Sequence, residues 1–76
     1  MDKNNPTLSA LAARNIKLAL VDQDLTKNAL AIKAGIPSTS FDRKLNHEPE
    51  KFTLKDLGCI AQALDLHFAD LLKDAA

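Results

Sequence analysis

The sequence predicts an all-α protein, and three observations favour that fold class. The chain has 76 residues, of which 46% are hydrophobic, yet it contains no Trp or Tyr and only three Phe. Its core must therefore be built from Leu, Ile and Ala, which favours helices over sheets. Leu and Ala recur at intervals of three and four residues, and no Asn-Gly or Asp-Gly hairpin turn occurs. We expect one domain at residues 7–74, after a flexible segment at residues 1–6.

The first helix is expected to begin at Thr7 or Ser9, either of which can cap it, and to run to about Asp22. Its apolar stripe follows helical spacing and is predicted to face the core. The stripe consists of Leu8, Ala12, Ile16, Ala19 and Leu20. Off the stripe lies a face that is solvated or could supply a phosphate contact, with Arg14, Asn15 and Lys17.

A short second helix is predicted to begin after Thr26, whose hydroxyl can accept an otherwise unpaired backbone N–H. Leu30 and Ala31 lie on its apolar face. Gly35 is expected to end this helix in the left-handed conformation, and Pro37 cannot continue it because proline lacks an N–H. The chain must therefore turn at this point.

A third helix is expected to start at Ser38 or Thr39, since either side chain can cap it. Phe41 and Leu45 stand at i and i+4, so they are predicted to face the core together. The outward side of this helix then carries Ser38, Thr39, Asp42 and Arg43.

Two further helices are predicted after a polar segment. Thr53 and Asp56 form a near capping box at the start of the fourth helix. Gly58 lies in its interior, which we interpret as close approach by another helix. The apolar face consists of Leu57, Ile60, Ala61 and Leu64. Asp65 can adopt the left-handed conformation, and His67 can cap a fifth helix.

Two short helices joined by a Gly-containing turn match the helix-turn-helix unit, whose second helix enters the major groove of DNA. A family resemblance rests on Ala31, Gly35, Ile36 and Phe41, on Asn15-Ile16-Lys17 in the first helix and on Ala69-Asp70-Leu71-Leu72 in the last. Over nearly its whole length the chain resembles the lambda-repressor-like, Cro-type helix-turn-helix domains of phage and bacterial regulators. One departure is Lys44, which stands where many relatives have an apolar residue, with Leu45 one place later. The resemblance implies a compact five-helix domain that binds DNA.

The candidate base-reading residues are Ser38, Thr39, Asp42 and Arg43. Arg43 is the strongest, because its guanidinium can bond guanine O6 and N7 together, worth about 1–3 kcal/mol of discrimination. Ser38 and Thr39 can donate or accept, and the Thr39 methyl can contact a thymine methyl. Asp42 could accept from cytosine N4 or orient Arg43, and a surface ion pair is an equally good interpretation.

The candidate phosphate contacts are Lys27, Ser40, Lys44 and Asn46. Lys27 opens the supporting helix, at the position from which relatives clamp the DNA backbone, while Lys44 and Asn46 lie near the end of the reading helix. Each lysine could equally serve solubility alone. Their convergence on one side of a helix-turn-helix is what favours a binding site.

Charge is distributed unevenly along a chain whose formal net charge is zero. Residues 1–55 carry +3 and residues 56–76 carry −3. Neutrality counts against a nucleic-acid binder, because such proteins usually have a high pI. A dipolar molecule could nevertheless present its positive side to phosphates, although a solvated charge pattern of this size is also common.

Length and composition argue against other function classes. A chain this small buries only about 60% of its unfolded surface, which leaves no room for an ordinary catalytic cleft. We therefore expect no enzyme activity, small-molecule substrate or cofactor. The single Cys59 excludes an internal disulfide, and His47 and His67 lack partners at metal-ligand spacing, so no metal site is expected. No apolar stretch approaches the roughly 20 residues of a membrane span.

Two functional hypotheses follow. The first is sequence-specific binding of a double-stranded DNA operator in the cytoplasm, at the nucleoid, to regulate transcription, most simply by repression. The alternative is an antitoxin-like or adaptor module that binds a protein through the acidic fourth and fifth helices. Related domains often bind as dimers to half-sites about 34 Å apart. A DNA-assisted homodimer and a monomer on an asymmetric site are both compatible with the sequence.

Overall fold

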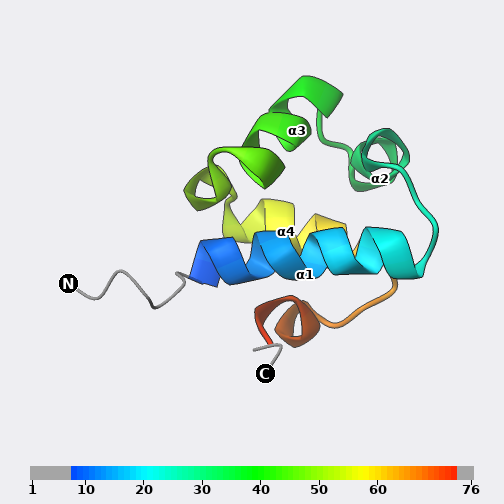
Figure 1. Ribbon diagram of the computed structural model, residues 1–76, viewed down its shortest axis with the longest axis vertical. Coiled ribbons are helices and arrows are strands. Elements are labelled where there is room, and N and C mark those ends of the chain that lie inside the picture. Colours follow the sequence, from blue (N-terminus) through cyan, green and yellow to red (C-terminus); the bar gives the residue numbers. More distant parts are fainter. Residues whose placement is uncertain (1–7, 74–76) are drawn as a thin grey trace.

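The structure, a computed structural model, describes residues 8–73 (Figure 1). In chain order, this part of the chain forms α1 (Leu8–Asp22), α2 (Lys27–Ala34), α3 (Ser38–Asn46), the 3₁₀ helix η1 (Pro49–Lys51), α4 (Leu54–Ala63) and the 3₁₀ helix η2 (Phe68–Leu72). Because no strand occurs among these residues, the all-α prediction is confirmed for them. The predicted flexible segment at residues 1–6, the Thr7 cap and residue 74 lie outside the described residues.

A 3₁₀ helix, η2, occupies the place of the predicted fifth α-helix, so the five-helix count is wrong. The His67 N–H donates to the Asp70 carboxylate at 3.0 Å, and the Asp70 N–H donates back to the His67 carbonyl at 2.9 Å. The side-chain amide of Asn15 on α1 then donates to the carbonyls of Leu71 at 2.7 Å and Lys73 at 2.8 Å. These carbonyls are satisfied by α1 and need no further helical turn.

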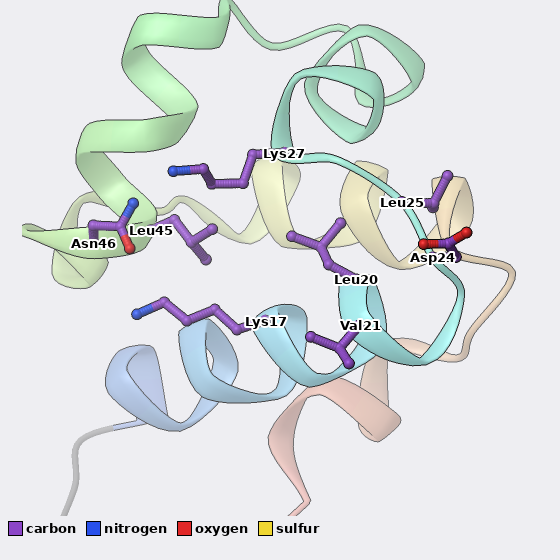
Figure 2. A pocket seen from close by; sticks show the side chains of 8 residues that line it. All are labelled: Lys17, Leu20, Val21, Asp24, Leu25, Lys27, Leu45 and Asn46. Atoms are coloured by element: carbon purple, nitrogen blue, oxygen red, sulfur yellow. The ribbon is translucent and has the colours of Figure 1, made fainter.

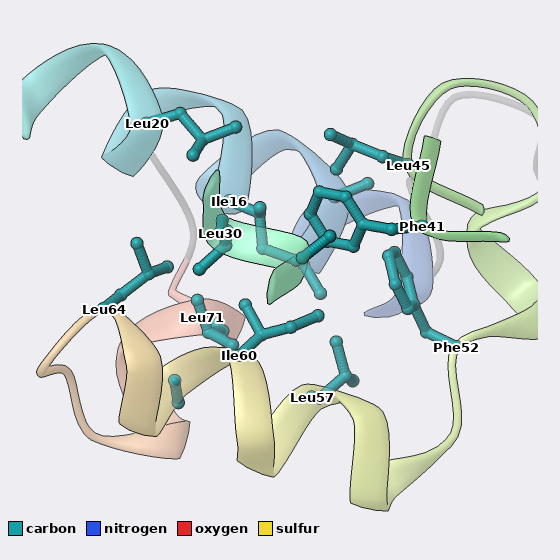
Figure 3. Close-up of a cluster of buried hydrophobic side chains, with 14 residues drawn as sticks. Ile16, Leu20, Leu30, Phe41, Leu45, Phe52, Leu57, Ile60, Leu64 and Leu71 are labelled. Atoms are coloured by element: carbon teal, nitrogen blue, oxygen red, sulfur yellow. The ribbon is translucent and has the colours of Figure 1, made fainter. Parts of the chain in front are cut away.

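The elements surround one hydrophobic core. α2 and α3 lie on one side of α1 and α4, and η2 lies on the other side of α1 (Figure 1). Accordingly, α2 contacts both α3 and α4, while η2 contacts α1 and α4. The largest fully buried side chains, which come from every α-helix and η2 (Figure 3), are Ile16, Leu30, Phe41, Leu45, Ile60, Leu64 and Leu71.

The apolar stripe predicted for α1 is confirmed except at its first residue. The members that face the core are Ala12, Ile16, Ala19 and Leu20. Leu8 is instead 66% exposed, and Leu11 is buried one turn later. The difference has a simple reason: Leu8 is the first residue of α1, and the helix begins beyond the edge of the core.

The two glycines differ in role. Gly35 has φ +75°, the left-handed conformation predicted for the end of α2. Gly58 lies within α4, but a Cβ placed there would meet nothing within 4 Å. The prediction that another helix approaches Gly58 is therefore wrong.

Candidate nucleic-acid interface

Hydrogen bonds cap both ends of α2, and those at its C-terminal end fix the turn into α3. The Thr26 hydroxyl accepts the Ala29 N–H at 3.0 Å and caps the helix, as predicted. After the left-handed Gly35, the Ile36 N–H donates to the Ala31 carbonyl at 2.9 Å. This bond closes the end of α2 and satisfies a carbonyl that would otherwise lack a partner. The direction in which α3 leaves α2 is thus set locally.

The start of α3 differs from the prediction that Ser38 or Thr39 caps it. Pro37 occupies the N-cap position, and its carbonyl accepts the Phe41 N–H at 2.9 Å. Ser38 is the first helical residue, and its hydroxyl donates to the side-chain carbonyl of Asn28 on α2. Pro37 has no side-chain acceptor, so α3 begins without a side-chain cap, and the Ser38 hydroxyl joins α3 to α2 instead.

The rotation of α3 places an apolar face inward and a polar face outward. Phe41 is fully buried and Leu45 is 2% exposed, which confirms the predicted inner face. Thr39 and Arg43 are exposed on the outer face, and Ser40 is only partly exposed. Two of the base-reading candidates, Thr39 and Arg43, therefore share one solvent-facing side of the helix.

Lys44 lies on the side of α3 that faces α4. Its ammonium is 2.9 Å from the carboxylate of Asp56, and the two side chains are 21% and 20% exposed. Asp56 also accepts the Thr53 N–H at 3.1 Å, while the Thr53 hydroxyl accepts the Asp56 N–H at 3.0 Å, so the predicted capping box is confirmed. Partial burial disfavours the Asp56 anion, but the hydrogen bonds from Lys44 and Thr53 outweigh it and lower the pKa of Asp56.

Asp42 brings together two of the predicted phosphate contacts. Its Oδ1 accepts from the Lys27 ammonium at 2.5 Å and from the Asn46 side-chain amide at 2.9 Å. The Lys27 and Asp42 side chains are each 50% exposed. The hydrogen bond from Lys27, with a smaller contribution from Asn46, lowers the pKa of Asp42 despite the opposing effect of desolvation. Asp42 is therefore favoured in its ionised form, and it neutralises the cation of Lys27 at the start of α2.

An open groove of about 500 Å³ lies beside this cluster, between α1, the start of α2 and the end of α3 (Figure 2). Leu20, Leu45 and other apolar side chains line it. Lys17 and Lys27 extend along it toward Asn46 (Figure 2). Polar groups from three helices thus converge on one end of the groove.

The comparison with protein families agrees with this geometry. The family model of the Cro/C1-type helix-turn-helix DNA-binding domain matches residues 15–76. The chain belongs to this family. No curated protein and no solved structure matches the chain. In this Cro/C1-type domain, α2 and α3 are two short helices joined by a turn that contains Gly35, which is the arrangement of a helix-turn-helix.

Within the Cro/C1-type domain, the structure gathers some of the predicted site residues and separates one of them. Lys27, Asp42 and Asn46 form one cluster, and Thr39 and Arg43 extend into solvent. Lys44 is held apart by its ion pair with α4.

Lys17 joins the groove although its sequence context gave only a weak signal. It lies off the apolar stripe of α1, a position that exposed lysines commonly occupy. The spacing of Lys17 and Leu20 could have indicated this position. Residues three apart are neighbours on a helix surface, and Leu20 also lines the groove.

Among residues 8–73, no helix is long and apolar enough to cross a membrane. No group of three or more His, Cys, Asp or Glu side chains in this range is arranged to hold a metal ion.

Proposed function

We propose that this Cro/C1-type domain is a sequence-specific regulator of transcription that inserts α3 into the major groove of an operator. The observation that carries this proposal is the rotation of α3. Phe41 and Leu45 bury one face of the helix, so Thr39 and Arg43 project from the other. A helix held in this way can present side chains to base edges without disturbing the core.

Arg43 and Thr39 are the proposed principal base readers. Arg43 forms no ion pair within residues 8–73, and both residues are exposed. The Arg43 guanidinium suits the paired acceptors of guanine, and Thr39 suits a polar edge or a thymine methyl. Ser38 can still accept a hydrogen bond while its hydroxyl donates to Asn28. It therefore serves as a secondary reader that also positions α3.

Lys27, Lys17 and Asn46 are the proposed phosphate contacts, and Ser40 supplies a weaker one. The first three lie around one groove, so a DNA backbone passing this end of α3 would meet all of them. Lys44 is assigned to the fold, because a phosphate would have to displace it from Asp56 at a site that is only about one-fifth exposed.

We propose repression as the regulatory outcome, because a compact domain bound at a promoter can prevent polymerase from occupying it. Two copies on adjacent half-sites would present their reading helices about 34 Å apart along one side of the duplex. Such an arrangement requires a palindromic operator, whereas a monomer would select an asymmetric one.

The test is selection of bound duplexes from a random-sequence pool, followed by titration of the recovered site with wild type and variants. Arg43→Ala is expected to lose about 1–3 kcal/mol of discrimination at one base pair. Lys33→Ala is the matched control, because it also removes one exposed cation. Lys33 lies in the last turn of α2 and does not line the groove. Equal losses in the two variants, or failure to recover a motif, would contradict sequence-specific reading and favour the protein-binding alternative.

A further inference from the structure

The side of α3 toward α2 contains a contact that works against DNA binding. Asp42 places a carboxylate beside Lys27 and Asn46, the groups proposed to meet the DNA backbone. The Asn46 amide also donates to the Asp42 main-chain carbonyl at 3.3 Å, which keeps the Asn46 side chain beside Asp42. A phosphate approaching Lys27 therefore competes with the Asp42 carboxylate, which the ammonium already contacts.

We infer, on the basis of the proposed function, that Asp42 is an internal competitor of DNA phosphate for Lys27 and so sets the affinity of the domain for any duplex. The geometry makes the exchange possible. The Lys27 and Asp42 side chains are each 50% exposed, so either can reach solvent without opening the core. Ion pairs of this kind are weak and are readily replaced.

The inner ion pair shows why this role belongs to Asp42 and not to every aspartate near α3. Asp56 holds Lys44 where both side chains are about one-fifth exposed, and it also caps α4 through Thr53. Replacing that carboxylate by a phosphate would break the cap as well as the ion pair. Among the ion pairs of residues 8–73, only Lys27–Asp42 combines an exposed position with a place beside the groove.

The same contact predicts that the affinity of the wild-type domain for DNA depends less on salt than the affinity of a variant without the Asp42 carboxylate. Each DNA phosphate neutralised by a protein cation adds about 0.9 to the slope of log affinity against log salt. A Lys27 that is already neutralised by Asp42 contributes less than this amount. Removing the carboxylate should therefore strengthen binding and steepen the salt dependence together.

The experiment compares Asp42→Asn with wild type on the selected operator and on an unrelated duplex. Asp42→Asn is expected to bind both duplexes about two- to fivefold more tightly, as release of an exposed ion pair implies. Between about 50 and 200 mM salt it should lose about 3.5-fold more affinity than wild type does, the value for one additional phosphate.

Asp65→Asn is the matched control, because it makes the same change in net charge at an exposed residue after α4. Asp65 has φ 60°, a conformation that asparagine also tolerates, so this variant should fold normally. An equal gain in affinity from Asp65→Asn would show an effect of global charge and would overturn the inference.

A double-mutant cycle with Lys27→Ala distinguishes competition from simple repulsion. If Asp42 acts by occupying Lys27, the gain from Asp42→Asn should largely disappear when Lys27 is absent. A gain of the same size in both backgrounds would overturn competition. Weaker operator binding by Asp42→Asn, with a changed base preference, would instead identify Asp42 as a base reader. If neither wild type nor Asp42→Asn binds DNA at low salt, the proposed function itself fails.

Discussion

The two sides of α3 each carry a lysine–aspartate pair, and the pairs differ in their surroundings. On the side toward α4, the Lys44–Asp56 pair is about one-fifth exposed and shares its carboxylate with the cap of α4. On the side toward α2, the Lys27–Asp42 pair is half-exposed and lies beside the groove. The same chemistry therefore serves the fold on one side and remains exchangeable on the other.

The largest expected loss of stability comes from the buried face of α3, which holds the helix that both pairs flank. Phe41 is fully buried, and its ring centroid lies 6.1 Å from that of Phe52. Phe41→Ala should destabilise the domain by about 3–5 kcal/mol, because it removes a core ring and leaves a cavity. Urea unfolding measures this loss, with Phe41→Leu as a milder variant and the exposed Thr39→Ala as the control. A small effect of Phe41→Ala would mean that α3 is not held by its inner face.

A smaller loss of stability should distinguish the Lys44–Asp56 pair from the Lys27–Asp42 pair. Asp56→Ala removes both the ion pair with Lys44 and the bond to the Thr53 N–H, and losses at helix N-termini of this kind are typically about 0.5–2 kcal/mol. Asp42→Ala should change the free energy of unfolding far less, because its partners remain solvated. Denaturant midpoints of the two variants test the difference. Equal destabilisation would remove the distinction between a structural and an exchangeable pair.

The smallest expected effect is a difference in acid sensitivity. The pKa of Asp56 is lowered in the folded protein from its usual value of 3.8, so folding favours the ionised form. Its contribution to stability is therefore complete above pH 3.8 and is lost as the pH falls through the lower, folded-state pKa.

Unfolding midpoints measured from pH 7 to pH 3 should show that wild type and Asp56→Ala converge at the acid end. Asp70, whose pKa is lowered mainly by its hydrogen bond with Lys73, titrates in the same direction, so Asp56→Ala should retain part of the pH dependence. A stability difference that stayed constant down to pH 3 would contradict the role given to the Asp56 carboxylate.

Features that depend on neighbouring residues could be predicted from the sequence. The Thr26 cap, the left-handed Gly35 and the Thr53–Asp56 box each involve residues no more than a few positions apart, so local rules of helix ends are sufficient. The inner face of α3 followed from the i, i+4 spacing of Phe41 and Leu45. Thr26, Gly35 and the inner face of α3 belong to the helix-turn-helix, whereas the Thr53–Asp56 box belongs to α4.

Features that depend on distant residues could not be predicted in the same way. The partner of Lys44 stands 12 positions away and that of Lys27 stands 15 positions away. Nothing in the spacing indicates which of several aspartates each lysine meets. Gly58 was also misinterpreted, because a glycine within a helix is equally compatible with open space and with a close contact.

The bond from Asn15 to the Leu71 carbonyl has a consequence for the order in which the chain folds. The two residues are 56 positions apart, whereas the contacts that join α2 to α3 span only 10 to 15 positions. Closing a long loop costs more chain entropy than closing a short one. The α2–α3 unit can therefore assemble early, and docking of η2 against α1 completes the molecule. Amide hydrogens in η2 should then exchange through an opening that leaves the α2–α3 unit intact.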